Sequence, residues 1–544
     1  MIRRIRLRPW QKVALEKFIA SESPDFLTVA TPGAGKTTFA LTAARHVLAD
    51  DPHRRLVVVA PTAHLKVQWE RAAAQFGLHL DPAWSTAVGR LPADMHGIIT
   101  TYQQVATSAA ALRGLAADAF VVFDEIHHAG DDRAWGESVR VAFEPAPRRL
   151  AISGTPFRSD TRAIPFVNYV IDEAAPDFEY GYADALADRR VVRPVYFPRT
   201  NGHMEWTAPD GAVHAATFDD DLDQTRSSQR LRTALSLEGE WLPTVLRQAI
   251  TQLEAVRRHQ PDAGGLVIAT DQDHARGIAD LLGTRFGQRA GVVTSDDPDS
   301  SAHIARFATG DEPWLVAVRM VSEGVDIPRL RVGVYATTTT TELFFRQAVG
   351  RFVRWTPGVT DQKAYFFIPD DPRLRARAFQ IADQRRHSLR RRAEERPERD
   401  PALLDNGAKE QLSLFAALSA VATDHQTHAA FESDDDVDDD LDPSFDDDPS
   451  LLVDLAPPPP LAGDRSHLDG ARAALGDETT RRQEKKRLRE KNAAVAALLV
   501  RNTGQSHAQV NAELNRLSGV GRISEATVGQ LRKRLDVAER LARG

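Results

Sequence analysis

The chain has 544 residues, which is too long for a single hydrophobic core and predicts about three domains. It contains no cysteine, which excludes disulfides, thiolate metal sites and cysteine nucleophiles. It also has no run of 18 apolar residues, and its first residues lack the apolar core of a signal peptide. We therefore expect a cytoplasmic location and no membrane partner.

Charge is distributed unevenly along the chain. The net charge is −7, but residues 432–448 carry eleven Asp and Glu and no Lys or Arg. Without that tract the chain carries a net charge of +4, which is compatible with a polyanionic partner. Low hydrophobicity, acidity and four consecutive prolines predict a disordered linker over 425–475.

In chain order, the first informative segment is Leu-Arg-Pro-Trp-Gln at 7–11, which precedes an amphipathic helical pattern. The amide of Gln11 can donate and accept a hydrogen bond at once, which suits the edge of an adenine ring. The alternative is an exposed polar residue at a helix start.

The segment Ala-Thr-Pro-Gly-Ala-Gly-Lys-Thr at 30–37 follows an apolar run and precedes an alanine-rich helical pattern. A glycine-bearing loop between a strand and a helix directs backbone N–H groups towards a phosphate chain. Lys36 would then reach the β- and γ-phosphates, and the Thr37 hydroxyl would hold Mg²⁺. The alternative, a plain turn, does not explain Lys-Thr at the mouth of the helix.

Apolar runs then alternate with helical patterns, which predicts a parallel, doubly wound sheet with polar residues at the carboxyl ends of its strands. The runs of the first domain are 56–60, 97–102, 120–123 and 150–152. A second cycle, at 265–270, 291–294, 314–318 and 332–336, predicts a second α/β domain. Residues 200–260 break the pattern and are interpreted as an insertion of short strands followed by helices.

Two carboxylates, Asp124 and Glu125, directly follow the run 120–123. Beside a phosphate loop, Asp124 would bind the Mg²⁺ shell and Glu125 would orient and deprotonate the attacking water. The alternative is a solvated turn at a strand end.

The adjacent residues His127 and His128 point in different directions and cannot easily chelate one metal ion. A polar link from the γ-phosphate site to Ser153 and Thr155 is the favoured interpretation.

Two arginines, Arg351 and Arg354, lie three apart on a predicted helix and so would share one face. Delivered from a second domain across a cleft, their guanidinium groups would neutralise charge on the γ-phosphoryl group. The neighbouring Gly350 indicates a close backbone approach. The alternative is a basic helix face that binds solvent or nucleic acid.

The order of these segments resembles superfamily-two DEAD/DEAH-box helicases of the DExH type, particularly restriction-enzyme motor subunits and excision-repair helicases. The resemblance covers about residues 5–370. The segments that carry it are 7–11, 30–37, 59–62, 100–103, 124–127, 153–158, 266–270, 323–328 and 347–354.

The resemblance implies two tandem RecA-like parallel-sheet domains, with ATP in the cleft between them and nucleic acid crossing both. It implies an ATP site formed by Arg8, Gln11, Gly33, Gly35, Lys36, Thr37, Thr38, Asp124, Gly324 and Asp326, with Thr37 and Asp124 holding Mg²⁺. The catalytic set is Glu125, Lys36, Arg351, Arg354 and Gln347. The coupling set is His127, Ser153 and Thr155, and the nucleic-acid set is Thr62, Thr101 and Tyr102.

Two positions depart from the pattern of the family. Gly154 replaces the usual alanine of the third motif, and Val353 replaces a glycine found in one subgroup. Neither change removes a reactive group. Because the third motif is thought to couple hydrolysis to movement, Gly154 bears on strand separation more than on ATP hydrolysis.

The C-terminal part is basic and helical in pattern, with fifteen Lys and Arg against eight Asp and Glu over 476–544. Two short helices around 519–521, the second capped by Ser524, resemble a helix-turn-helix arrangement. The alternative is a helical hairpin or oligomerisation module that docks a protein partner.

The expected domains are 1–180 and 185–375 (the RecA-like pair), a basic helical extension at 376–424, the linker at 425–475 and the helical region at 476–544. The leading hypothesis is an ATP-dependent DNA helicase or translocase. The alternatives are an RNA helicase and an ATP-gated assembly or motor subunit of a restriction or phage-defence system.

Overall fold

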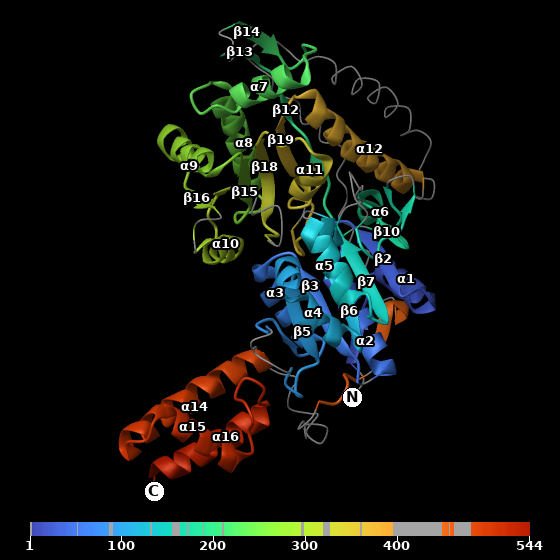
Figure 1. Ribbon diagram of the computed structural model, residues 1–544. Coiled ribbons are helices and arrows are strands. Elements are labelled where there is room, and N and C mark those ends of the chain that lie inside the picture. The colour runs from blue at the N-terminus through green and yellow to red at the C-terminus, as the bar shows by residue number, and fades with distance from the viewer. Residues whose placement is uncertain are drawn as a thin grey trace. The chain divides into compact units, whose positions relative to one another are not determined.

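The computed structural model describes residues 3–543 except 52, 86–90, 131–132, 155–163, 171–172, 189, 209–211, 295–296, 298, 319–326, 360–361, 395–448, 456 and 462–479. The chain forms two compact units, whose elements are labelled in Figure 1. The first comprises 1–30, 35–179 and 444–544, and the second comprises 31–34 and 180–443. The C-terminal helices therefore belong to the same unit as the N-terminal domain.

The first unit is built on a seven-stranded sheet in the order β10-β2-β7-β6-β3-β5-β4. Its six strands from β2 to β4 in that order pair in parallel, and the central ones are buried along nearly their whole length because helices cover both faces. Its strands are β2 (Asp25–Ala30), β3 (Arg55–Ala60), β4 (Leu80–Asp81), β5 (Gly97–Thr101), β6 (Ala119–Asp124), β7 (Arg148–Ser153) and β10 (Phe178–Tyr180). The predicted parallel α/β fold is confirmed.

The helices of the N-terminal part of this unit alternate with the strands. They are α1 (Pro9–Ala20), α2 (Lys36–Asp50), α3 (Ala63–Gln75), α4 (Tyr102–Ala116) and α5 (Arg133–Phe143), with the 3₁₀ turn η1 (Ile126–Gly130) after β6. Thr62 and Thr101 are the N-caps of α3 and α4, and each side-chain oxygen accepts a backbone N–H of the first turn. Both helices are thus anchored at the carboxyl edge of the sheet.

Part of the predicted linker is a strand on the first unit. The strand β20 (Leu452–Leu455), after the 3₁₀ turn η5 (Pro449–Leu451), pairs antiparallel with β1 (Arg3–Arg6). Further on, the Pro459 carbonyl lies 3.1 Å from Nε2 of His96. Backbone pairing and the burial of Leu455 fix this stretch, which refines the prediction for 425–475. The acidic tract at 432–448 lies outside the described residues.

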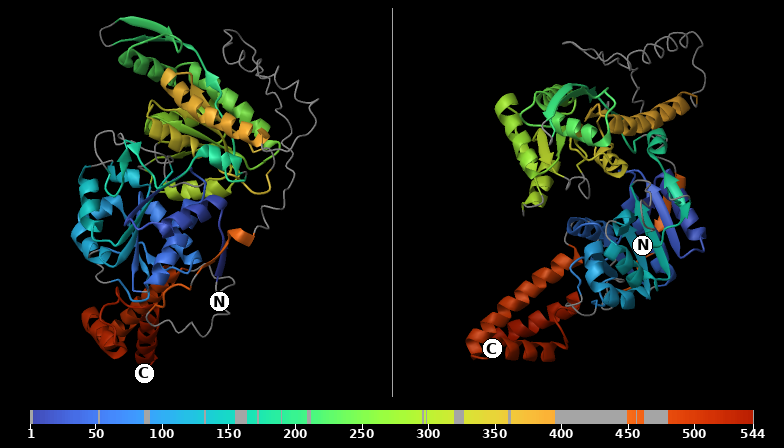
Figure 2. Two further views of the ribbon diagram at one scale, coloured as in Figure 1. Left: turned by 90° about the vertical axis from the view of Figure 1, so that its right-hand side faces the viewer. Right: turned by 45° about the horizontal axis from the view of Figure 1, so that its top comes forward.

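The C-terminal helices α14 (Arg481–Thr503), α15 (His507–Ser518) and α16 (Val528–Arg543) lie side by side in Figures 1 and 2. Arg534, which is fully buried, donates to the side-chain oxygens of Asn492 on α14 and of Asn511 and Asn515 on α15. One arginine of α16 therefore ties all three helices together.

The connection between α15 and α16 corrects the predicted helix-turn-helix. It spans 519–527, much longer than the three or four residues of that turn. The side chain of Thr527, not Ser524, accepts the first-turn N–H of Gln530. The polar network around Arg534 favours a three-helix bundle over a two-helix helix-turn-helix unit.

The second unit contains another parallel sheet, in the order β11-β19-β18-β15-β17-β16, with β12 paired to β19. Its strands are β11 (Val195–Tyr196), β12 (Arg199–Thr200), β15 (Gly264–Ala269), β16 (Ala290–Val293), β17 (Trp314–Ala317), β18 (Leu330–Ala336) and β19 (Ala364–Pro369). Its helices are α6 (Tyr182–Ala187), α7 (Gln224–Ala234), α8 (Trp241–Arg257), α9 (Gln272–Phe286), α10 (Ser300–Thr309), α11 (Glu342–Val349) and α12 (Pro372–Glu394).

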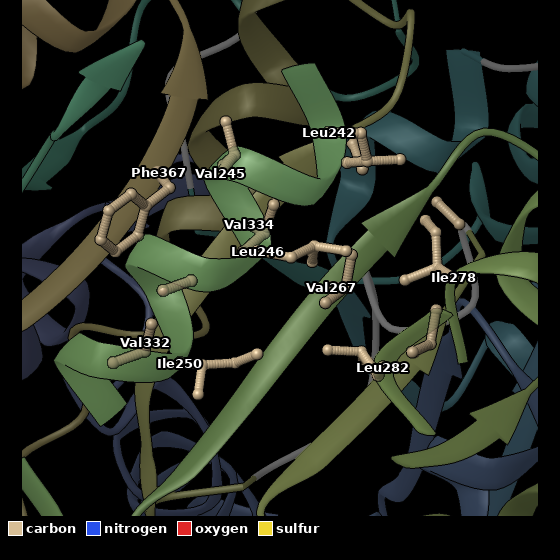
Figure 3. Close-up of a cluster of buried hydrophobic side chains, with 14 of the residues drawn as sticks. Leu242, Val245, Leu246, Ile250, Val267, Ile278, Leu282, Val332, Val334 and Phe367 are labelled. Atoms are coloured by element: carbon tan, nitrogen blue, oxygen red, sulfur yellow. The ribbon is translucent and has the colours of Figure 1, made fainter. Parts of the chain in front are cut away.

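The core of this second unit lies between α8, α9 and the sheet. Figure 3 shows Leu246 and Ile250 of α8 facing Val267 of β15, and all three are buried. The predicted insertion contains the antiparallel hairpin β13 (His203–Thr207) and β14 (Val213–Thr217), followed by α7 and α8. None of the described helices combines the length and apolar character that a membrane span requires.

We expect Gly97→Ala to lower the free energy of unfolding by about 1–3 kcal/mol, the usual cost of overpacking. A Cβ at Gly97 would overlap the Leu56 carbonyl of the neighbouring strand β3. Chemical denaturation of the two variants Gly97→Ala and Gly114→Ala would measure the effect. Gly114 lies on α4 with no atom within 4 Å of a built Cβ, so the control should gain up to about 1 kcal/mol. Equal stability of the two variants would contradict the tight β3–β5 approach.

Candidate nucleotide-binding site

The phosphate loop connects β2 to α2, and Lys36 is the first residue of that helix. Gly33 and Gly35 have φ values of +82° and +94°, a backbone region that residues with a Cβ rarely adopt. A Cβ at Gly35 would also lie 2.7 Å from Nε2 of Gln11. Both glycines are therefore required by the path of the loop, whose end carries the positive N-terminus of α2.

Gln11 holds helix α1 against this loop. Its Nε2 donates to the Gly35 carbonyl at 2.9 Å, and its Oε1 accepts from the backbone N–H of Arg8 at 2.8 Å. The residue is 2% exposed, so both halves of the amide are engaged within the chain. The structure places Gln11 and Arg8 beside the loop, and it shows the Gln11 amide supporting the loop backbone and not presented to a base.

Glu125 lies opposite Lys36. Its Oε1 is 3.2 Å from Nζ of Lys36, while its Oε2 accepts from the Gly154 backbone N–H at 2.8 Å and from Oγ of Ser153 at 3.2 Å. Glu125 has a φ of +48°, a strained conformation for a residue with a side chain. This turn directly after β6 directs the carboxylate towards the loop, which sequence spacing alone could not show.

The adjacent carboxylates have different environments. Burial opposes the ionisation of Glu125, but Lys36, His127 and the Gly154 N–H outweigh it and hold its pKa well below the usual range. Burial and the charge of Glu125 raise the pKa of Asp124 to about 6. A bound cation would favour the ionised form of Asp124.

Asp124 is held by two aromatic residues. Its Oδ2 accepts the indole N–H of Trp69 at 2.8 Å, and its backbone carbonyl accepts the hydroxyl of Tyr102 at 2.9 Å. Tyr102 is 0% exposed, so the prediction that its side chain contacts nucleic acid is wrong. Trp69 is not among the site residues that the sequence predicts. The signal was the indole itself, because a buried Trp N–H usually needs an acceptor.

His127 and Ser153, the two predicted coupling residues that the structure describes, also lie beside Glu125. Nδ1 of the buried His127 lies 3.2 Å from Oγ of Ser153 and 3.6 Å from Oε2 of Glu125. Because the Ser153 hydroxyl donates to Glu125, Nδ1–H of His127 must be the donor to Ser153. The structure thus links the end of β7 to the carboxylate through a polar chain.

Mg²⁺ typically takes one or two carboxylates, phosphate oxygens and water as ligands. The hydroxyl of Thr37 at the start of α2 and the carboxylate of Asp124 at the end of β6 are hard oxygen donors of this kind. Among the described residues there is no cluster of three or more His, Asp or Glu that could hold a metal. The donor pair Thr37 and Asp124 fits a Mg²⁺ ion that also takes phosphate oxygens and water as ligands.

The arginines of the second unit depart from the predicted helix face. Helix α11 carries Gln347 but ends at Val349, and residues 350–352 form a tight turn. Arg354 then forms an isolated bridge with Val192, because the buried Phe352 and Val353 draw the chain into the core of that unit. Arg351 and Arg354 therefore do not share a helical face.

Three of the remaining predicted site residues lie at the starts of helices. Thr62 and Thr101 are partly exposed and cap α3 and α4, and Thr38 is partly buried in the first turn of α2. Thr155, Gly324 and Asp326 lie outside the described residues.

A glycine loop between a strand and a helix, with a lysine paired to one of two carboxylates at the end of β6, two strands away in the sheet, is typical of phosphate-loop nucleotide-binding folds. Residues 4–158 match the family described as Type III restriction enzyme, res subunit. A protein from Halobacterium salinarum provisionally named DNA 3'-5' helicase Rad25 is 24% identical over 349 residues, covering 61% of this chain and 49% of that protein. These similarities support the resemblance of the chain to superfamily-two helicases.

A nearer relative in sequence is an uncharacterized protein of Mycobacterium leprae, 48% identical over 391 residues. The match covers 70% of this chain, and the chain spans 65% of the length of that relative. One solved structure, a fragment of a provisionally named HsdR subunit of a type I restriction enzyme from Vibrio vulnificus YJ016, is 17% identical. Its TM-score is 0.46, and the match covers 66% of this chain and 64% of that one.

Replacing Gln11 by Ala should lower the free energy of unfolding by about 1–3 kcal/mol, because the Gly35 carbonyl and the Arg8 N–H lose a buried partner. Denaturant titration followed by circular dichroism would measure the loss. The matched control is Gln103→Ala on the exposed side of α4, expected within about 0.5 kcal/mol of the parent protein. Indistinguishable variants would mean that the Gln11 contacts contribute nothing to stability.

Proposed function

We propose that the protein is an ATP-dependent DNA helicase or translocase, which couples hydrolysis of Mg-ATP to movement on or unwinding of nucleic acid. The observation that carries the proposal is the 3.2 Å pair of Lys36 and Glu125, with Glu125 held on its other side by Ser153 and Gly154. The ammonium group of Lys36, which would bind phosphate, and the candidate general base Glu125 therefore lie in one site.

Each residue has a distinct part in the proposed reaction. The loop N–H groups and Lys36 bind the phosphates, so Lys36 exchanges its contact with Glu125 for phosphate oxygens. Glu125, ionised and oriented by Gly154, then accepts a proton from the attacking water. Thr37 and Asp124 would hold Mg²⁺, which would supply charge neutralisation on the phosphates when bound.

The same carboxylate offers a route from hydrolysis to movement. Glu125 accepts a hydrogen bond from Ser153, which is in turn bonded to His127, so a change in the charge of Glu125 alters the contacts at the end of β7. The coupling role is proposed for His127, Ser153 and Thr155. Thr62 and Thr101, at the carboxyl edge of the same sheet, are the proposed strand contacts.

DNA is the proposed substrate because the family model describes a restriction-enzyme subunit and the Halobacterium relative is named as a DNA helicase. ATP turnover measured with single-stranded DNA, duplex DNA and RNA tests this choice. Stimulation by RNA alone would favour an RNA helicase. Turnover that no nucleic acid changes would favour an ATP-gated assembly subunit of a restriction or phage-defence system.

For Glu125→Gln, we expect nucleic-acid-stimulated ATP turnover to fall about 100-fold or more, because the amide cannot accept the proton. ATP affinity should change little, since the phosphates are bound by the loop. The measurements are steady-state phosphate release and equilibrium nucleotide binding. Lys36→Ala should instead lose affinity and turnover together.

The matched control for Glu125→Gln is Glu137→Gln, because Glu137 is an exposed carboxylate of α5 paired with Arg140. An exposed ion pair contributes little, so turnover should be unchanged. Full turnover of Glu125→Gln would overturn the proposed mechanism.

For Arg351→Ala and Arg354→Ala, we expect turnover to fall about 1000-fold if both supply charge to the γ-phosphoryl group, as arginine fingers do. Single-turnover kinetics would separate this loss from a loss of ATP affinity. Arg285→Ala, which removes an exposed pair with Glu240, serves as the control. An arginine whose removal leaves turnover unchanged is not a finger.

A further inference from the structure

Trp69 is a buried residue of α3 whose single polar atom meets a candidate metal ligand. Its exposed fraction is 2%, and its indole N–H donates to Oδ2 of Asp124 at 2.8 Å. An indole has one donor and no acceptor, so this bond uses its entire hydrogen-bonding capacity. A bond to an ionised carboxylate is also among the stronger kinds in proteins.

The helix turn that carries Trp69 is also held by contacts of the neighbouring residue. The next residue, Glu70, is 4% exposed and accepts from Oγ1 of Thr480 at 2.7 Å and from a guanidinium nitrogen of Arg482 at 3.1 Å. Thr480 is the N-cap of α14, so the C-terminal bundle holds α3 in place. Two consecutive residues of one helix thus contact the candidate metal ligand and the bundle.

A second contact anchors the same bundle. Nζ of Lys485 on α14 lies 2.6 Å from Oδ1 of Asp94, and both side chains are almost fully buried. The other oxygen of Asp94 accepts the backbone N–H of Val528, the first residue of α16. The bundle therefore contacts the N-terminal part of the first unit at Glu70 on α3 and at Asp94 just before β5.

We propose that Trp69 is a positioning residue for magnesium: its indole N–H fixes the orientation of the Asp124 carboxylate that receives the cation. The proposal rests on the proposed function, in which Asp124 is a Mg²⁺ ligand. The donors that orient metal ligands commonly contribute about 10- to 100-fold to metal affinity or activity. Tyr102 completes the arrangement by holding the backbone of Asp124.

The test is Trp69→Phe in the full chain, which removes the N–H and keeps an aromatic ring in the core. Binding of a fluorescent ADP is measured without Mg²⁺ and during a Mg²⁺ titration. We expect the Mg²⁺ concentration for half-maximal effect to rise about 10-fold or more, while nucleotide affinity without Mg²⁺ stays within about threefold. If Trp69 had only a structural role, Trp69→Phe would weaken nucleotide binding equally with and without Mg²⁺. That result would overturn the proposal.

The matched control is Trp314→Phe in the second unit. Trp314 is fully buried, and its indole nitrogen has no hydrogen-bond partner within the described part of the chain. The control should leave the Mg²⁺ dependence unchanged, and a shift equal to that of Trp69→Phe would overturn the proposal. Thermal unfolding of both variants identifies any general loss of structure.

Failure of the proposed function has a different signature. If the parent protein binds nucleotide with no dependence on Mg²⁺, Asp124 is not a magnesium ligand and both proposals fall. If the parent protein responds to Mg²⁺ and Trp69→Phe responds identically, only the role of Trp69 is overturned.

Discussion

The structure of the candidate site depends on the burial of two adjacent carboxylates at the end of β6. Two negative charges this close cannot both stay ionised in an apolar setting unless each has its own donors. Glu125 obtains Lys36 and the Gly154 N–H, whereas Asp124 obtains the indole of Trp69. The positive φ of Glu125 separates the two side chains and assigns each to its own partners.

The same constraint explains why so many elements converge on this edge of the sheet. The phosphate loop, the end of β7 and the helices α3 and α4 each supply one donor or one anchoring contact to the two carboxylates. The side chain of Gln11 stabilises the phosphate loop by donating a hydrogen bond to the Gly35 carbonyl. The site is therefore a set of mutually dependent hydrogen bonds, and removal of one donor leaves a buried acceptor unsatisfied.

The C-terminal segment is part of the first unit because it contributes buried polar contacts as well as backbone pairing. Strand β20 completes a ladder with β1, and Lys485 forms a buried ion pair with Asp94. A buried pair costs desolvation of both charges and is weak evidence for stability, but it disfavours any arrangement that leaves either charge alone. Its effect here is to specify one docking position for the bundle.

The sequence by itself determined the alternation of strands and helices, the phosphate loop and the carboxylates after β6, because these depend on local periodicity and spacing. Tertiary structure alone decided the burial of Tyr102, the bond from Trp69 to Asp124 and the placement of Arg354 beyond the end of α11. It also decided the pairing of β20 with β1 and the long connection between α15 and α16. The physical reason is that a side chain's partner or a strand's neighbour is chosen by residues distant in the sequence, which local pattern does not encode.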